Sequence, residues 1–272
     1  MTKLENSRIK TTLLAATTAL ALVGAGVTAA PAIPEHKVSA FKKGFVAPLI
    51  AQSGLNTFNL VNNGQSPASL LLARINDGLT FEQVMDAFAK NPGEALAMVQ
   101  LGGGVFDTVP GASNQATLDL KAGTYAVISG QNAPRKLVVT DRRGDKPSAP
   151  AASATVVLKD FAFDMPETVK AGKQVWHVEN KGRQAHEFIV VKLQAGKSIE
   201  DVKAFLESQD GQTPPPGEFL GGALPFAGGY QAFVTVDLPA GEYYALCFMP
   251  DMEGGKPSHV HAGMAKAFKV IN

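Results

Sequence analysis

An internal repeat constrains the fold of this chain more than any other feature of its sequence. When one part of the 272-residue chain is shifted by 118 residues, two long stretches align without a gap. The matched positions are glycine, turn and apolar residues, namely Asn62/Asn180, Gly64/Gly182, Gly78/Gly196, Glu82/Glu200, Val84/Val202, Gly103-Gly104/Gly221-Gly222, Asp119/Asp237, Gly123/Gly241 and Tyr125/Tyr243. A repeat of fixed period indicates one structural unit that is used more than once. We therefore predict two domains of one fold at residues 38–142 and 152–272, joined by a polar linker at residues 143–151.

The second copy is predicted to consist mostly of short strands. Segments rich in Val and aromatic residues are separated by glycine-containing turns, and they cover residues 155–163, 175–179, 188–193, 232–238, 242–248 and 265–271. Residues 198–206 differ, because Ser198 and an acidic first turn precede a helical apolar pattern, and residues 80–88 repeat this feature in the first copy. The expected fold class is therefore all-β, with two tandem Greek-key β-sandwiches that each carry one inserted helix.

Residues 1–32 have the pattern of a bacterial-type signal peptide. Lys3, Arg8 and Lys10 precede an uncharged stretch over residues 11–30, which ends in small residues. The stretch is about long enough to span a bilayer, but Thr, Ala and Gly dilute it, so cleavage is favoured over a permanent anchor. Cleavage within residues 27–29 and within residues 30–32 both remain open. We predict that the mature protein is periplasmic or secreted, with no stable membrane insertion.

Charge and cysteine content exclude several classes of function. The chain has 25 Lys and Arg against 24 Asp and Glu, a net charge of +1. Loss of the signal peptide removes three positive charges and one negative charge, which leaves −1. Such a neutral chain has no electrostatic footprint for nucleic acid. Its one cysteine excludes a disulfide framework, an iron–sulfur cluster and a Cys-paired zinc site.

The two copies differ most where residues that can bind metals occur. His186 of the second copy aligns with Ala68 of the first, and Cys247 aligns with Ser129. After Cys247 the second copy has a long loop, whereas the first copy continues almost directly into its last strand. Further candidate ligands lie in that loop, namely Met249, Met252, His259, His261 and Met264. The second copy is thus a candidate metal-binding domain, and the first serves as its metal-free counterpart.

A blue-copper site binds its metal through two imidazoles, one thiolate and a weak axial thioether. The second copy offers these donors as a distant His, a Cys at a strand end, and then a His and a Met. The pattern resembles the cupredoxin (type 1 blue copper) family, whose fold is also a β-sandwich of this kind. The resemblance covers the second copy, and the first copy is similar only as a cupredoxin-like domain without ligands. It implies that His186, Cys247, His259 and Met264 bind one copper per chain, which cycles between Cu(I) and Cu(II).

Two features of the loop leave alternatives open. Familiar cupredoxins have only a few residues between Cys and the second His, whereas residues 248–258 separate them here. His261 is an alternative ligand to His259, and Met249 and Met252 offer competing sulfurs. His177 is interpreted as structural, and Glu187 as possible support for its neighbour His186.

The expected function is one-electron transfer with a redox partner protein rather than catalysis. One alternative is a periplasmic copper carrier that exchanges Cu(I) with a donor or acceptor through a flexible Met- and His-containing loop. Another is a metal-free interaction module. A Cys–His nucleophilic pair is a further possibility, although nothing resembles a protease signature. The carrier requires a flexible loop, whereas electron transfer is favoured by a rigid, packed one.

Overall fold

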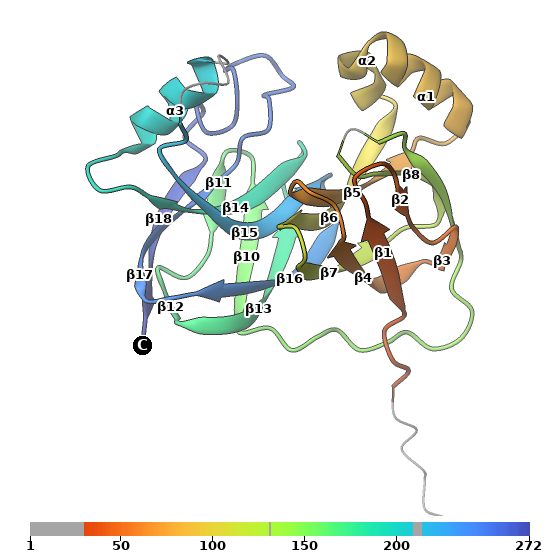
Figure 1. The fold of residues 1–272 in the computed structure, drawn as a ribbon, viewed down its shortest axis with the longest axis horizontal. Coiled ribbons are helices and arrows are strands. Elements are labelled where there is room, and N and C mark those ends of the chain that lie inside the picture. The colour runs from red at the N-terminus through yellow and green to blue at the C-terminus, as the bar shows by residue number, and fades with distance from the viewer. Residues whose placement is uncertain (1–29, 131, 209–213) are drawn as a thin grey trace, which may run out of the picture.

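The computed structural model describes residues 30–130, 132–208 and 214–272 of the chain (Figure 1). The predicted signal peptide, apart from its last three residues, lies outside the described residues. The strands of the N-terminal half are β1 (Glu35–Ala40), β2 (Phe45–Val46), β3 (Ile50–Gln52), β4 (Gly54–Asn62), β5 (Ala68–Ile75), β6 (Val99–Thr108), β7 (Ser113–Leu120), β8 (Gly123–Ile128) and β9 (Arg135–Thr140). Those of the C-terminal half are β10 (Ala154–Lys159), β11 (Ala162–Asp164), β12 (Thr168–Lys170), β13 (Gly172–Asn180), β14 (His186–Leu193), β15 (Gly217–Phe226), β16 (Gln231–Leu238), β17 (Gly241–Leu246) and β18 (Ala265–Ile271).

The strands form two sheets that each run through both halves of the chain. One sheet has the order β11-β10-β13-β16-β7-β4-β1-β2, and the other has the order β12-β18-β17-β14-β15-β6-β5-β8-β9-β3. The halves join where β16 pairs with β7 and where Phe226 of β15 pairs with Gly102 of β6. This architecture confirms the predicted all-β, cupredoxin-like sandwich. The domain boundaries at 38–142 and 152–272 stay a prediction.

Corresponding strands pair in the same way in both halves. β1 is parallel to β4, which is antiparallel to β7, just as β10 is parallel to β13, which is antiparallel to β16. Likewise β5 lies between β6 and β8, and β14 lies between β15 and β17. The first strand of each half, β1 or β10, thus pairs in parallel with a strand that is not its neighbour in the chain. This pairing differs from a simple meander, in which consecutive strands pair.

Several residues that align at the 118-residue shift make the same hydrogen bonds. The Asn62 amide donates to the carbonyls of Ser66 and Thr108, and the Asn180 amide donates to those of Gln184 and Phe226. Each asparagine thus links a turn to a neighbouring strand. These bonds satisfy the side-chain amide, which explains why a polar residue is buried at both positions.

The aligned tyrosines have a structural role as well. The Tyr125 hydroxyl donates to the Lys121 carbonyl at 2.9 Å, and the Tyr243 hydroxyl donates to the Pro239 carbonyl at 2.7 Å. Both rings are fully buried while their hydroxyls bind a backbone four residues earlier. This arrangement resembles the tyrosine corner of Greek-key sandwiches.

The aligned glycine pairs mark close approaches between strands. A Cβ on Gly104 would collide with the backbone carbonyl of Leu70, and a Cβ on Gly222 would collide with that of Phe188. Only glycine therefore allows β6 to lie so close to its partner strand β5, and β15 to lie so close to β14, at these points. Both glycines lie next to a register shift in the pairing of the two strands.

The predicted helices are present. α1 (Phe81–Lys90) begins with a capping box formed by Thr80 and Gln83, and α3 (Ile199–Ser208) begins beside Ser198. A second short helix, α2 (Pro92–Leu96), follows α1 in the N-terminal half and was not expected from the sequence. No helix of the described residues is long and apolar enough to cross a membrane.

The predicted strand at residues 155–163 is instead a hairpin. β10 ends at Lys159, β11 begins at Ala162, and the turn residue Phe161 has a φ of 64°. A bulky side chain seldom adopts this conformation, so the sequence showed no turn there. β15 was also not predicted, because its glycines interrupt the alternation of apolar residues.

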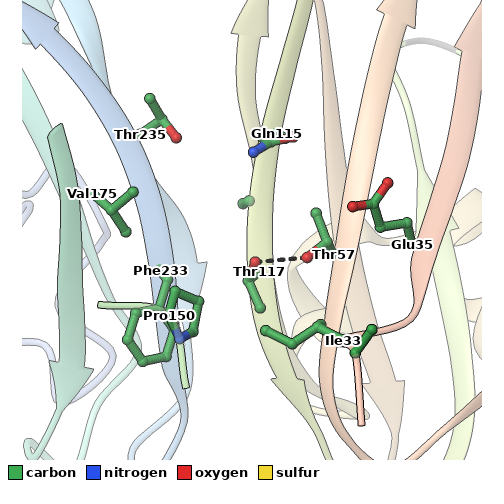
Figure 2. Close-up of a pocket in the computed structure, with 11 residues that line it drawn as sticks. Ile33, Glu35, Thr57, Gln115, Thr117, Pro150, Val175, Phe233 and Thr235 are labelled. Atoms are coloured by element: carbon green, nitrogen blue, oxygen red, sulfur yellow. Dashed lines mark hydrogen bonds between the residues drawn. The ribbon is translucent and has the colours of Figure 1, made fainter. Parts of the chain in front are cut away.

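A groove of about 310 Å³ crosses the solvent face of the first sheet where β7 and β16 meet (Figure 2). Thr57 and Thr117, on neighbouring strands of its wall, share a hydrogen bond of 2.8 Å between their hydroxyls. Phe233 and Pro150 lie on the opposite side. Among the described residues that line the groove there is no His, Cys or Met to bind a metal.

Candidate metal centre

His186, Cys247 and His259 come together at one end of the C-terminal half. The Cys247 sulfur lies 3.3 Å from Nδ1 of His259 and 3.9 Å from Nδ1 of His186, and the two Nδ1 atoms are 2.9 Å apart. All three side chains are fully buried. Among the described residues, they are the one group of three His, Cys, Asp or Glu side chains whose donor atoms converge in this way.

Two adjacent strands place the first two residues side by side. His186 begins β14, and Cys247 directly follows β17, its antiparallel neighbour, with Ile189 opposite Leu246. The backbone N–H of Glu187 donates to the Cys247 sulfur at 3.4 Å. An N–H aimed at the sulfur stabilises a thiolate, so this bond would support Cys247 as a metal ligand.

The long loop returns His259 to these strands through backbone hydrogen bonds. The N–H of His259 donates to the Met249 carbonyl at 2.8 Å, and the N–H of Met264 donates to the His259 carbonyl at 2.9 Å. The N–H of Cys247 in turn donates to the Met264 carbonyl at 3.3 Å. Both ends of the loop are thus bonded to the strand end that carries the cysteine.

Side-chain packing holds the same loop from two directions. Val260 is fully buried in a small apolar cluster with Val202 of α3 and Leu246 of β17. Met264 is fully buried in the main core, to which Cys247 also belongs. Because Val260 and Met264 are buried in two separate clusters, His259, which directly precedes Val260, has little freedom to move.

The outer nitrogen of each imidazole has a hydrogen-bonding partner. Nε2 of His186 lies 3.0 Å from Oδ1 of Asp160, and Nε2 of His259 lies 3.2 Å from Oε1 of Gln184. The ring of Phe161 meets that of His259 edge-on, with centroids 5.1 Å apart. The β10–β11 turn therefore covers both imidazoles. Neither Asp160 nor Gln184 was identified from the sequence, because the hairpin at Asp160 was taken for a strand.

Burial determines the protonation of the cluster without metal. It lowers the pKa of His259 to about 4, and it lowers that of His186 against the opposing hydrogen bond to Asp160. Burial and the nearby Glu187 raise the pKa of the Cys247 thiol to about 12. Burial also raises the pKa of Glu187 to about 7, although its carboxylate accepts the N–H of Phe248 at 2.8 Å. Near neutral pH both imidazoles are thus neutral and able to act as metal ligands.

The donors fit copper. Two nitrogens and a sulfur bound at roughly 2 Å in a trigonal set would lie about 3.5 Å from one another, close to the separations found here. Thiolate and imidazole together suit both oxidation states of copper. His186, Cys247 and His259 therefore form a candidate copper site. The buried Met264 is joined to it by backbone hydrogen bonds to His259 and Cys247.

The alternative ligand His261 does not join this cluster. Its ring contacts Ser258 at 2.7 Å and Glu207 of α3 at 3.1 Å. Met252 is exposed and Met249 is partly buried at the edge of the core.

Two further histidines lie on the strands, away from the cluster. His36 contacts Asn56, and His177 contacts Gln231 and stacks on Phe233. The interpretation of His177 as structural agrees with these contacts.

The corresponding place in the N-terminal half is a cavity. Ala68 and Ser129, which align with His186 and Cys247, line about 330 Å³ together with Asn62 and Asn132. Where the structure describes its lining, none of the residues is His, Cys or Met. The two halves thus present a packed donor cluster and an open cavity at equivalent positions.

Neither a protein-family profile nor a curated protein sequence matches the chain. Among solved structures, reduced auracyanin from Roseiflexus castenholzii is 23% identical, with 45% of this chain and 100% of that chain covered and a TM-score of 0.32. Auracyanin A from Chloroflexus aurantiacus, described as a blue copper protein, is 22% identical over 43% and 96% of the two chains, with a TM-score of 0.27. A blue copper oxidase from Nitrosomonas europaea is 13% identical over 88% and 86%, with a TM-score of 0.24.

These TM-scores are low, so the assignment of the site depends on the geometry above. The all-β fold and the His-Cys-His cluster agree with the resemblance to the cupredoxins, which is thereby confirmed. They indicate copper binding or electron transfer as the class of function.

Proposed function

We propose that the chain is an exported one-electron transfer protein with a type 1-like copper site in its C-terminal half. In this proposal His186, Cys247, His259 and Met264 would hold the metal. The observation that carries it is the convergence of two imidazole nitrogens and a thiol sulfur within 2.9–3.9 Å, in a fully buried and packed place. Copper bound there would supply a one-electron Cu(II)/Cu(I) couple.

The packing of the ligand-bearing elements supports electron transfer. His186 and Cys247 lie at the ends of paired strands, and His259 is held by its own backbone bonds and by the burial of Val260. Ligands that are held from all sides keep nearly the same positions in both oxidation states. A small rearrangement on gain or loss of an electron favours fast transfer.

The same packing argues against the copper carrier. A carrier needs ligands that leave the metal readily, and the Met- and His-containing loop was expected to be flexible in that case. Within residues 248–264, His259 and Met264 are fully buried, and the exposed Met252 lies outside the cluster. Among the described methionines, Met252 is the one that is largely exposed to solvent.

Catalysis by one chain would need a place for a substrate beside the metal. His259 is covered by Phe161, and His186 is covered by Asp160, so the donor atoms face protein on the sides described. This favours transfer of electrons through the protein over direct reaction with a substrate. We propose a redox protein as the partner, a periplasmic or extracellular location, and a first domain without metal.

The test is voltammetry of the copper-loaded protein, followed by competition with a Cu(I) chelator. Reversible reduction with the metal retained over many cycles is the expected result. Rapid loss of Cu(I) to the chelator would instead support the carrier. The His261→Ala variant is the matched control, since His261 lies on the same loop but contacts Ser258 and Glu207.

A further inference from the structure

We propose that Asp160 and Gln184 are positioning residues that hold the protons of both histidines on their outer nitrogens, which leaves the two inner nitrogens free for a metal. This inference rests on the proposed copper site. It deepens that proposal, because it assigns a role to two residues outside the ligand set. It also assigns a role to the long loop between Cys247 and His259, which contacts the Gln184 amide.

The long loop fixes the orientation of the Gln184 amide. Nε2 of Gln184 donates to Oδ1 of Asp251 at 2.9 Å, and Oε1 accepts the backbone N–H of Met252 at 2.9 Å. A flipped amide would place its oxygen against the carboxylate and its NH₂ against another donor. Since Oε1 can only accept, the Nε2 of His259 at 3.2 Å must be the donor and must carry the proton.

Asp160 does the same for His186. Its Oδ1 accepts the backbone N–H groups of Arg183 at 2.9 Å and of Gln184 at 3.2 Å. Its Oδ2 faces the backbone N–H of Arg183 at 3.1 Å and the Arg183 Nε at 3.3 Å, so both oxygens face N–H donors, as those of an ionised carboxylate do. An ionised carboxylate only accepts, so Nε2 of His186 at 3.0 Å carries the proton.

A neutral imidazole has one N–H, and in both rings it is now on Nε2. Both Nδ1 atoms therefore present lone pairs, which face each other at 2.9 Å beside the Cys247 sulfur. This arrangement is repulsive without a cation, because at most one thiol proton can lie between three acceptors. A metal ion relieves the repulsion, so the outer partners prepare the cluster for it.

The N-terminal half lacks this arrangement together with the ligands. At the 118-residue shift, Asp160 aligns with Lys42 and Gln184 aligns with Ser66. The loop that supplies Asp251 and Met252 has no counterpart after Ser129. The outer partners and the long loop therefore occur only where the ligands do.

The test reads the proton positions directly in the metal-free protein, by ¹⁵N NMR of the histidine rings. In the wild type, His186 and His259 are expected to be Nε2–H tautomers. Gln184→Met is expected to move His259 toward Nδ1–H, and Asp160→Ala to do so for His186. Asp160→Asn is expected to restore the Nε2–H form, since its amide oxygen can still accept.

Copper affinity is then measured by competition with a chelator of known affinity. Gln184→Met and Asp160→Ala are expected to weaken binding about 10- to 100-fold. The matched controls are Gln231→Met, which removes an equivalent Gln–His bond to His177, and Asp164→Asn on the same hairpin. Both controls are expected to bind copper as the wild type does.

Nδ1–H on either histidine of the folded wild type would overturn the inference, as would variants that keep both the tautomers and the affinity. The circular dichroism of each variant identifies one that fails to fold, and Asp160→Asn then decides. If the wild type shows both Nε2–H forms but binds no copper, the proposed function fails while the tautomer assignment stands.

Discussion

A single methyl group added at Gly182 should separate His186 from its carboxylate partner. A Cβ on this residue would lie 2.5 Å from Oδ1 of Asp160 and 2.7 Å from Nε2 of His186. Gly182 does not have a positive φ, so alanine is compatible with the backbone and the effect is steric. Ordinary contact begins at 3.4 Å, so the carboxylate oxygen must move by about 0.9 Å.

Such a movement breaks the 3.0 Å hydrogen bond between Asp160 and His186. Loss of a bond to a charged group costs about 1.5–3 kcal/mol, and the overpacking adds about 1–3 kcal/mol. We expect Gly182→Ala to lower the free energy of unfolding of the metal-free protein by about 3 kcal/mol. Copper affinity should fall by about 10- to 100-fold, as for other changes to the partners of metal-bound histidines.

The assays are urea unfolding of the metal-free protein and copper competition on the folded protein. The aligned Gly64→Ala is the matched control, because its Cβ would crowd only Oδ1 of Asn62, at 2.9 Å, in the half without ligands. The control should lose some stability and no copper affinity. If Gly182→Ala kept wild-type stability and affinity, the described contact between Asp160 and His186 would be refuted.

Three further outcomes are expected. In the metal-free wild type, the pKa of His259 is lowered to about 4 and that of His186 is also lowered, so both histidines cost stability as the pH falls from 7 to 5. The pKa of Glu187 is raised to about 7, so protonation of Glu187 adds stability over the same range and offsets part of this loss. Glu187→Gln removes the effect of Glu187, so on this pH change the variant should lose about 2 kcal/mol more than the wild type, measured by urea unfolding. A variant with the same pH dependence as the wild type would contradict the assignment. Val260→Ala should cost about 2 kcal/mol and speed amide hydrogen exchange across residues 248–264, with unchanged exchange speaking against the anchoring of the loop. His259→Ala should abolish the visible copper band and His261→Ala should leave it intact, and the reverse result would exchange the two histidines as ligands.

The class of fold was readable from the sequence because both copies follow the same rules. Val- and aromatic-rich segments became strands, and the capped apolar patterns at residues 80–88 and 198–206 became α1 and α3. The aligned Asn and Tyr residues make the same hydrogen bonds in both halves. Sequence patterns are sufficient to predict an element where the local preference of each residue agrees with the overall fold.

The hairpin between β10 and β11 was missed because it departs from those rules. Phe161 has a positive φ in a turn where glycine would be expected, and its ring lies against His259. Strain of this kind concentrates at functional sites, where another contact offsets it. The conformation depends on a loop that is about a hundred residues away in the chain, so no local pattern could indicate it.

The candidate ligands were found by comparing the copies, but their supporting residues were not. His186, Cys247 and His259 are the residue types that bind copper, and each stands where the first copy has none. Asp160 and Gln184 are common surface residue types, and only their hydrogen bonds to the imidazoles distinguish them. Those bonds depend on the three-dimensional arrangement of a hairpin, a turn and a long loop.

The most direct test of the copper site is a visible absorption spectrum of the mature protein titrated with Cu(II), with Cys247→Ser as the control. A thiolate bound to Cu(II) in a trigonal site gives an intense band at about 600 nm. We predict that this band saturates at one copper per chain and is absent from the variant. A wild-type protein with no such band, or a band that survives in Cys247→Ser, would contradict the assignment of Cys247 as a copper ligand.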